Sequence, residues 1–322
     1  DHGCDWSSDV CSSDLMGFGD AQTGMHSWTL KEEQSKEIIK RAIDLGINFF
    51  DTAIGYQGGS SERFVGKAIK EYAKREAMVI ATKFFPRTPK EIEDNVSAKN
   101  RINQLLNQSL KNLDTDYIDL YICHAWDYNS PIEEIMETLY EAVKAGKVRY
   151  IGISNCFAWQ IAKANYIAEK NNWAKFVSIQ GHYNLLYREE EREMFPYCKD
   201  ENIALTPYSP LASGRLVKAR GETSKRLEED TYAKGKYDAT AEQDGIIIDR
   251  VAELAEKKGL TRSQVAIGWL LSKVASPIIG ATKISHIEAA VESFPVKLSE
   301  EELAYLEEPY VPHKLVGMMK RN

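Results

Sequence analysis

Long hydrophobic runs are missing from this chain of 322 residues. Its longest apolar stretches have the length of a strand, as in Ile118–Cys123, whereas a membrane-spanning helix needs about 20 consecutive apolar residues. A dense cluster of Lys and Arg is also missing, and 41 basic against 48 acidic residues give a net charge of −7. Nucleic-acid-binding proteins usually carry such a basic patch. We therefore expect neither a membrane nor a nucleic acid as a partner.

Cysteine is scarce and scattered. An odd number of cysteines without a Cys-x-x-Cys pair favours neither a disulfide framework nor a zinc site. The first residues also lack the basic start and the apolar stretch of a secretory signal. These absences favour a protein of the reducing cytoplasm. The five cysteines are Cys4, Cys11, Cys123, Cys156 and Cys198.

The composition is that of an ordinary globular protein. Apolar residues make up 43% of the chain, aromatic residues 10% and charged residues 28%. These values exclude a disordered chain, a collagen-like repeat and a coiled-coil rod. The length suits one large α/β domain or two ordinary domains.

Residues 1–15 differ from the rest of the chain. The segment DHGCDWSSDVCSSDL is acidic and rich in Ser, and it shows neither helical nor strand periodicity, while patterned sequence begins at Met16. It resembles a translated sequencing adapter, and a natural disordered tail is the alternative. We therefore expect a non-native or disordered segment at 1–15 and one domain at 16–322.

Helix and strand patterns alternate from residue 31 onward. Predicted helices span residues 31–45, 61–74, 98–113, 131–146, 158–170, 189–201, 245–258, 262–272 and 285–293. Predicted strands span residues 47–53, 78–85, 117–125, 148–154, 176–180, 203–207 and 277–280. The strands are nearly continuous apolar runs, which is typical of a parallel sheet covered by helices on both faces.

This rhythm predicts a (β/α)8 TIM barrel, with one further strand before Met16. The alternative is a doubly wound open sheet, but no Gly-x-Gly-x-x-Gly turn follows an early strand. Ser12, Ser13 and Asp14 would make a poor buried strand, because an unpaired charge in the core costs several kcal/mol. We therefore expect the first strand to be damaged or replaced.

One charged insertion interrupts the pattern at residues 213–244. It is rich in Lys, Arg, Glu and Asp, and it is too long for a structureless connector in a compact domain unless it serves a site. A lid or cofactor strap is one interpretation, and a solvated charged excursion is the other.

Ionisable residues follow three consecutive predicted strands. Asp51 and Tyr56 come after the first, Lys83 after the second and His124 after the third. In a parallel barrel the functional face lies at the carboxyl ends of the strands, so these side chains are expected to share one rim. Burial of Lys83 and Asp51 favours their pairing. A lysine cation beside Tyr56 would lower the tyrosine pKa from about 10 and make it a better acid.

Taken singly, each of these residues also has a structural explanation. A strand-end Asp often caps the next helix, a Lys often extends along the surface, and a His is often a satisfied core residue. The residues taken together are more specific than any one of them. The set consists of residues 48–53 with Tyr56, Ser61-Glu62 and Gly66, residues 81–83, and residues 119–121 with His124. These motifs resemble the aldo-keto reductase family.

The resemblance extends from Met16 to the C-terminus and implies a barrel that binds a nicotinamide dinucleotide without a Gly-rich fingerprint. It makes Tyr56 the general acid that protonates a carbonyl oxygen as hydride arrives. Lys83 and Asp51 become the partners of Tyr56, and His124 polarises and positions the carbonyl.

Further positions match the cofactor site of this family and favour NADP(H) over NAD(H). Structural alternatives stay open: Asn155 as a helix cap, Gln180 as a partner of strand carbonyls, Tyr208 as a core residue and Lys283 as a solvated side chain. The matching positions are Gly19 near the ribose and nicotinamide; Ser154, Asn155 and Gln180 at the carboxamide; Tyr208 as the stacking ring; Ser209, Leu211, Ser213 and Gly214 around the pyrophosphate; and Gly280, Thr282, Lys283 and His286 at the 2′-phosphate.

The resemblance predicts NADPH-dependent reduction of an aldehyde or ketone. Aromatic residues in strand-end loops, Trp126, Phe85 and Trp28, are candidates for the substrate pocket, with packing at the rim as the alternative. A second function stays open, because reductase-like β subunits of potassium channels bind the same cofactor as slow redox sensors.

Overall fold

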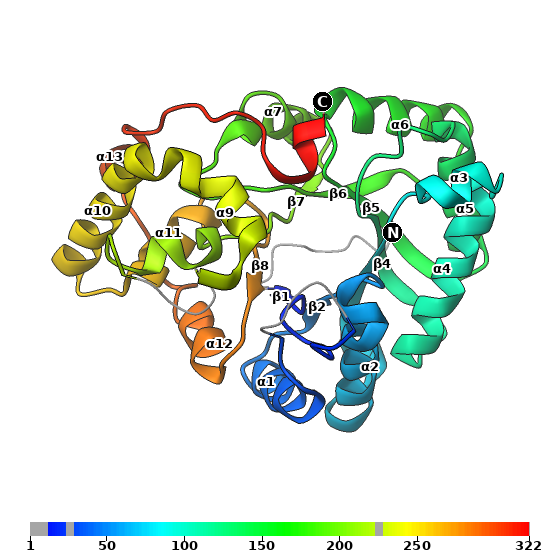
Figure 1. Ribbon diagram of the computed structural model, residues 1–322, viewed down its shortest axis with the longest axis horizontal. Coiled ribbons are helices and arrows are strands. Elements are labelled where there is room, and N and C mark those ends of the chain that lie inside the picture. Colours follow the sequence, from blue (N-terminus) through cyan, green and yellow to red (C-terminus); the bar gives the residue numbers. More distant parts are fainter. Residues whose placement is uncertain (1–11, 24–28, 223–227, 322) are drawn as a thin grey trace.

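The computed structural model describes residues 12–23, 29–222 and 228–321. Strands lie toward the middle of the molecule and helices lie outside them (Figure 1). Eight strands form one sheet in the order β7-β6-β5-β4-β3-β2-β1-β8, and neighbouring strands run parallel. Their bounds are β1 Ser12–Asp14, β2 Phe49–Asp51, β3 Val79–Phe84, β4 Ile118–Cys123, β5 Val148–Ser154, β6 Phe176–Gln180, β7 Ala204–Leu205 and β8 Ile278–Gly280.

The two ends of this sheet, β7 and β8, are brought together by backbone hydrogen bonds. The Ile278 N–H donates to the Pro207 carbonyl at 2.8 Å, and the Ser276 N–H donates to the Leu205 carbonyl at 3.4 Å. The parallel sheet and the surrounding helices are consistent with the predicted (β/α)8 barrel.

The helices agree with most of the sequence pattern. The segment predicted as one helix at 189–201 is divided: Glu189–Glu191 form a 3-10 turn, and the helix begins at Met194. Three helices, α3, α9 and α13, were outside the predicted set. The bounds are α1 Glu32–Asp44, α2 Ser60–Tyr72, α3 Pro89–Glu93, α4 Ala98–Leu113, α5 Ile132–Lys144, α6 Ala158–Lys170, α7 Met194–Asp200, α9 Thr231–Tyr237, α10 Ala241–Lys258, α11 Arg262–Leu271, α12 Ile284–Val291 and α13 Glu300–Glu307.

The strand that was expected to be damaged is present, though short. β1 has three residues, and it pairs with both β2 and β8. Leu15, directly after it, is fully buried, and its N–H donates to the Asp51 carbonyl at 3.0 Å. The rest of the expected N-terminal segment, residues 1–11, lies outside the described residues.

The core is made of clusters of buried residues. A small cluster consists of Phe49, Ala81, Leu120 and Ile122, which lie on β2, β3 and β4. A larger cluster lies between the strands and the helices. There α2 and α4 approach closely at Gly66, where a Cβ atom would overlap the Leu113 backbone carbonyl. The absence of a side chain at this position allows the two helices to pack.

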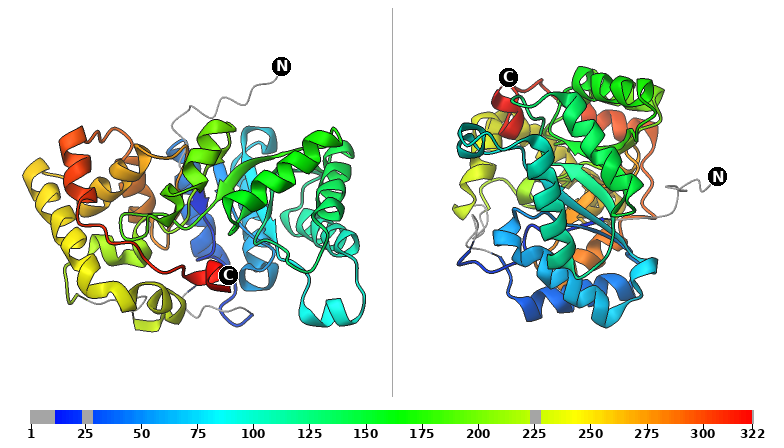
Figure 2. Two further views of the ribbon diagram at one scale, coloured as in Figure 1. Left: turned by 90° about the horizontal axis from the view of Figure 1, so that it is seen from above. Right: turned by 90° about the vertical axis from the view of Figure 1, so that its right-hand side faces the viewer.

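The charged insertion, interpreted either as a lid or cofactor strap or as a solvated charged excursion, is folded over much of its described length. It contains a 3-10 turn at Ala212–Val217 and helix α9, and α10 already begins at Ala241. Helix α9 packs against a C-terminal 3-10 turn at Gly317–Arg321. Figure 2 follows this C-terminal segment, in red, from α13 along the yellow helices toward the middle of the molecule.

Three cysteines fall in the described residues, and all three are buried and free of disulfides. Burial raises the pKa of the Cys123 and Cys156 thiols and raises the pKa of Cys198 to about 12. Over the same described ranges, no cluster of three or more His, Cys, Asp or Glu side chains is arranged to hold a metal ion. In that part of the chain, no helix combines the length and the apolar character needed to cross a membrane.

Candidate active site

The four predicted catalytic residues meet at the carboxyl ends of β2, β3 and β4. Asp51 ends β2, Lys83 lies near the end of β3, and His124 directly follows β4. Tyr56 opens a 3-10 turn after β2. The Lys83 ammonium lies 3.4 Å from the Tyr56 hydroxyl, and the rings of Tyr56 and His124 have centroids 5.8 Å apart at an angle of 75°.

Lys83 and Asp51 form a completely buried ion pair. Both side chains are shielded from solvent, and the ammonium donates to Asp51 Oδ1 and, at 2.8 Å, to the Thr52 carbonyl. The other carboxylate oxygen accepts a hydrogen bond from Gln180 Nε2 at 3.0 Å. A buried charge pair is tolerated when further hydrogen bonds satisfy both partners. The pair therefore holds a fixed positive charge beside the Tyr56 hydroxyl.

His124 is a buried, neutral imidazole. Burial, and next to it the Lys83 charge, hold the pKa of His124 well below its usual range. The Phe85 ring stacks on it with a centroid distance of 4.1 Å and an angle of 19°. Its Nδ1 has no hydrogen-bond partner within the described residues. A neutral imidazole keeps one N–H to donate, which suits a carbonyl oxygen near Tyr56.

The residues predicted to hold the carboxamide lie next to this tetrad. Asn155 Nδ2 donates to the His124 carbonyl at 2.9 Å and to Ser154 Oγ at 2.8 Å. Ser154 Oγ donates to the Gln180 carbonyl at 2.7 Å, and the Tyr208 hydroxyl donates to Asn155 Oδ1 at 3.0 Å. The helix cap suggested for Asn155 is not observed, because Phe157 is the N-cap of α6. The Gln180 side chain likewise contacts Asp51 rather than a strand carbonyl.

Tyr208 and the segment after it form a cradle. The Tyr208 ring lies nearly parallel to the His182 ring, with centroids 5.4 Å apart at 11°. Positive φ angles occur at Ser209 (60°), Ser213 (55°) and Gly214 (97°). Backbone amides in such left-handed turns form concavities that bind anions. Leu211 is the N-cap of the 3-10 turn at Ala212–Val217, which contains Ser213 and Gly214. Such left-handed turns are found where a protein binds an anionic group.

The residues predicted at the 2′-phosphate meet at the start of α12. Gly280 ends β8, and Lys283 is the exposed N-cap of α12. The Thr282 N–H donates to His286 Nδ1 at 3.3 Å. A cation beside the N-terminus of a helix favours a phosphate group.

Gly19 follows β1 and lies against the turn that carries Tyr56. Its φ of 135° is favourable for glycine, and a Cβ atom there would come within 2.6 Å of Ser60 Oγ and 2.5 Å of Gln57 Cβ. The absence of a side chain at Gly19 lets the chain after β1 pack directly on this turn.

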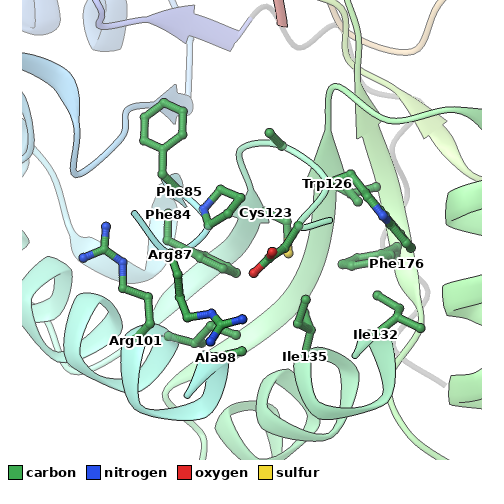
Figure 3. A pocket seen from close by; sticks show the side chains of 15 residues that line it. Phe84, Phe85, Arg87, Ala98, Arg101, Cys123, Trp126, Ile132, Ile135 and Phe176 are labelled. Carbon is green, nitrogen blue, oxygen red and sulfur yellow. The ribbon is translucent and has the colours of Figure 1, made fainter. Parts of the chain in front are cut away.

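The predicted substrate residues are only partly brought together. Phe85 lies at the tetrad through its contact with His124, and in Figure 3 it points away from the other labelled side chains. Trp126 lines a cavity of about 20 Å³ on the outer side of β3 and β4. That volume suits a single water molecule and no organic substrate. Trp28 lies outside the described residues.

Two residues beside Tyr208 escape prediction from the sequence. His182 lies two positions after Gln180, the last residue of β6. An ionisable residue shortly after a strand is the same signal that pointed to His124. Lys236 lies in the charged insertion, where the pattern does not distinguish it from its neighbours. Its ammonium is 4.8 Å from the centroid of the Tyr208 ring.

Comparisons with known proteins agree with this geometry. The aldo/keto reductase family model matches residues 15–310. The versiconal hemiacetal acetate reductase of Aspergillus parasiticus is 42% identical over 319 residues, which cover 92% of each protein. An aldo-keto reductase of Metarhizium robertsii is 39% identical over 314 residues, covering 90% of this chain and 85% of the relative.

A solved structure is also similar. It is the crystal structure of a thermostable aldo-keto reductase in complex with the inhibitor epalrestat, with a TM-score of 0.73, 28% identity and coverage of 93% of this chain and 94% of that one. The family match spans nearly the whole chain, and the site residues of the resemblance lie inside it. The chain therefore belongs to the aldo/keto reductase family, and it is an oxidoreductase of the carbonyl-reducing kind.

Proposed function

We propose that this protein reduces an aldehyde or ketone to an alcohol with NADP(H), and that Tyr56 is the general acid. The observation that carries the proposal is the Lys83 ammonium, which is paired with Asp51 and lies 3.4 Å from the Tyr56 hydroxyl. We further propose a closed (β/α)8 barrel as the scaffold and the cytoplasm as its location.

The proton comes from the Tyr56 hydroxyl. As Tyr56 gives up its proton to the carbonyl oxygen, the Lys83 ammonium stabilises the phenolate that forms. The Asp51 carboxylate keeps the ammonium in place, and Gln180 keeps the carboxylate in place. His124 donates its ring N–H to the same carbonyl oxygen, which orients the carbonyl and polarises it.

The cradle beside the tetrad supports a nicotinamide dinucleotide as the cofactor. When bound, the nicotinamide supplies the hydride that reduces the carbonyl carbon. Ser154, Asn155 and Gln180 would hold its carboxamide, and Tyr208 would support its ring. The turn that begins at Ser209 would enclose the diphosphate. Lys283 and His286 favour NADP(H) over NAD(H), which a comparison of turnover with the two cofactors tests.

The decisive variant is Tyr56→Phe. Removal of the acid should lower turnover by roughly a hundred- to ten-thousandfold, because the Tyr56 hydroxyl is the proton donor that the Lys83 ammonium contacts. The assay follows the loss of reduced-nicotinamide absorbance with a panel of aldehydes and ketones. Cofactor affinity, measured by fluorescence titration, should stay unchanged. Equal turnover in the variant and the parent protein would refute Tyr56 as the acid.

The same assay separates the reductase from the redox sensor. A sensor would bind the cofactor yet turn over slowly with every carbonyl in the panel. The complete tetrad favours the reductase, because its buried ion pair places a cation beside the hydroxyl that would give up the proton. Dinucleotide binding without turnover in the parent protein would instead favour the sensor.

A further inference from the structure

A buried ammonium group lies beside Tyr208 without a polar partner. Lys236, on α9, is 5% exposed. Its Nζ is 4.8 Å from the centroid of the Tyr208 ring and 4.4 Å from that of the Tyr232 ring. Across the described ranges it makes no hydrogen bond and no ion pair with another side chain. Aromatic faces attract the positive charge but cannot act as full hydrogen-bond acceptors for the three N–H groups. The ammonium can therefore still donate hydrogen bonds to an oxyanion.

The groups around Lys236 leave it charged at neutral pH. Burial lowers the pKa of Lys236 to about 8, and the Asp230 carboxylate opposes this effect. Asp230 is already engaged as the N-cap of α9, where Oδ1 accepts from the Ala233 N–H at 2.9 Å. The other titratable neighbours are Tyr208, Tyr232 and His182, and burial holds His182 neutral by lowering its pKa. The C-terminal turn contributes the backbone of Gly317 near the lysine stem.

Helix α9 is fixed to the cradle that follows Tyr208. Arg215, in the turn after the cradle, forms an ion pair of 2.9 Å with Asp238 at the end of α9. The Tyr237 hydroxyl accepts a hydrogen bond from Asn184 Nδ2 at 3.0 Å, and the same amide donates to the Ser209 carbonyl at 2.9 Å. Helix α9, which carries Lys236, is therefore attached to the segment that contains the left-handed turns.

We propose that Lys236 binds the diphosphate of the dinucleotide, so that the insertion supplies a charged contact to the cofactor. The inference rests on the proposed function and names a residue of that same site. A buried cation with free donors, on a helix attached to a segment of left-handed turns, is suited to a diphosphate. A carboxylate on the substrate is the other source of the same oxyanion chemistry.

The test measures binding in the full-length protein. Lys236→Met keeps the apolar stem and removes the charge, Lys236→Arg keeps a charge, and Lys234→Met removes an exposed lysine from the same helix. Isothermal titration should show affinity for NADPH and NADP⁺ reduced about ten- to a hundredfold in Lys236→Met. It should be unchanged in Lys234→Met and partly restored in Lys236→Arg. Thermal unfolding checks that each variant is folded.

Proton uptake provides a second readout. Near pH 8 about half of Lys236 is neutral, and an adjacent diphosphate favours the charged form, so binding should take up as much as about half a proton. Titrations in two buffers of different ionisation enthalpy detect this uptake. It should disappear in both Lys236→Met and Lys236→Arg, because neither side chain titrates there.

Each remaining outcome contradicts a different statement. If Lys236→Met binds both cofactors as the parent protein does, the inference is wrong while the reductase proposal stands. If only substrates with a carboxylate lose affinity, the anion belongs to the substrate and the diphosphate assignment is wrong. If the parent protein binds no dinucleotide, the proposed function fails and the inference fails with it.

Discussion

At the scale of single residues, the site depends on buried charges that hold each other in place. Lys83 and Asp51 are completely buried, where a lone charge would be unstable. Strand-end positions were enough to predict Asp51, Lys83 and His124. The Gln180 amide that completes the carboxylate contacts could not be predicted as its partner, because 129 positions separate the two residues in the chain.

Removal of one member of the Lys83–Asp51 pair should lower the free energy of unfolding more than removal of both members. Lys83→Met leaves the Asp51 carboxylate buried without its cation, so the free energy of unfolding should fall by about 3–5 kcal/mol. The double variant Lys83→Met with Asp51→Asn should recover much of that stability and remain inactive. Urea denaturation of the two variants and the parent protein measures the difference. A double variant less stable than Lys83→Met would contradict this account.

Two buried histidines should make the protein sensitive to mild acid. The pKa values of His124 and His182 are depressed by burial, whereas an unfolded histidine titrates near about 6.5. Below that pH the unfolded chain binds more protons than the folded one, so stability falls as pH falls. Each histidine contributes up to about 1.4 kcal/mol per pH unit. His182→Phe should therefore flatten the pH dependence of the unfolding free energy below about pH 6.5, and an unchanged slope would argue against a neutral, buried His182.

At the scale of elements, the long helices follow from their periodicity, and short ones depend on local capping. Helices α4 and α6 have the predicted bounds because apolar residues recur along one face. Helices α3 and α13 begin with capping boxes, Thr88 with Glu91 and Ser299 with Glu302. That motif is visible in the sequence and could have revealed both helices. Helix α9 is only seven residues long and has Asp230 as its N-cap but no capping box, so its sequence pattern is weaker.

Two glycines in helices should respond to alanine in opposite directions. Gly66→Ala would place a methyl group on the Leu113 carbonyl and force α2 away from α4, at a cost of about 1–3 kcal/mol. Gly235, in α9, has no atom within 4 Å of the position of a Cβ. Gly235→Ala should therefore stabilise the protein by about 0.5–1 kcal/mol through helix propensity. Thermal unfolding of the pair checks both signs, and equal shifts would show that close packing at Gly66 is unimportant.

At the scale of the whole molecule, the strands of the parallel sheet differ in length. β3 and β4 have six residues each, while β1, β2 and β8 have three. The alternation of apolar runs was enough to predict the fold class and seven strands. It could not predict that Ser12–Asp14 form a strand, because these residues pair through their backbone, and backbone pairing is independent of the side-chain pattern.

The difference in strand length should appear in the rates of amide hydrogen exchange. The amides of Ile118–Cys123 lie in a long strand between two neighbours and should exchange slowest. The Leu15 amide, which donates to the Asp51 carbonyl beside the short β1, should exchange faster. Exchange measured by mass spectrometry or NMR tests the order. Equal protection of the two segments would show that β1 is as stable as the central strands.

The buried thiols have a practical consequence for work with this protein. A thiol reacts with alkylating reagents as the thiolate, and Cys123, Cys156 and Cys198 are shielded from solvent and hard to ionise in the folded state. Modification at each of them must wait until its own neighbourhood opens. The rate at which each thiol is labelled therefore reports how often its region opens, without an engineered probe: Cys123 reports on the end of β4, Cys156 on the segment before α6 and Cys198 on α7.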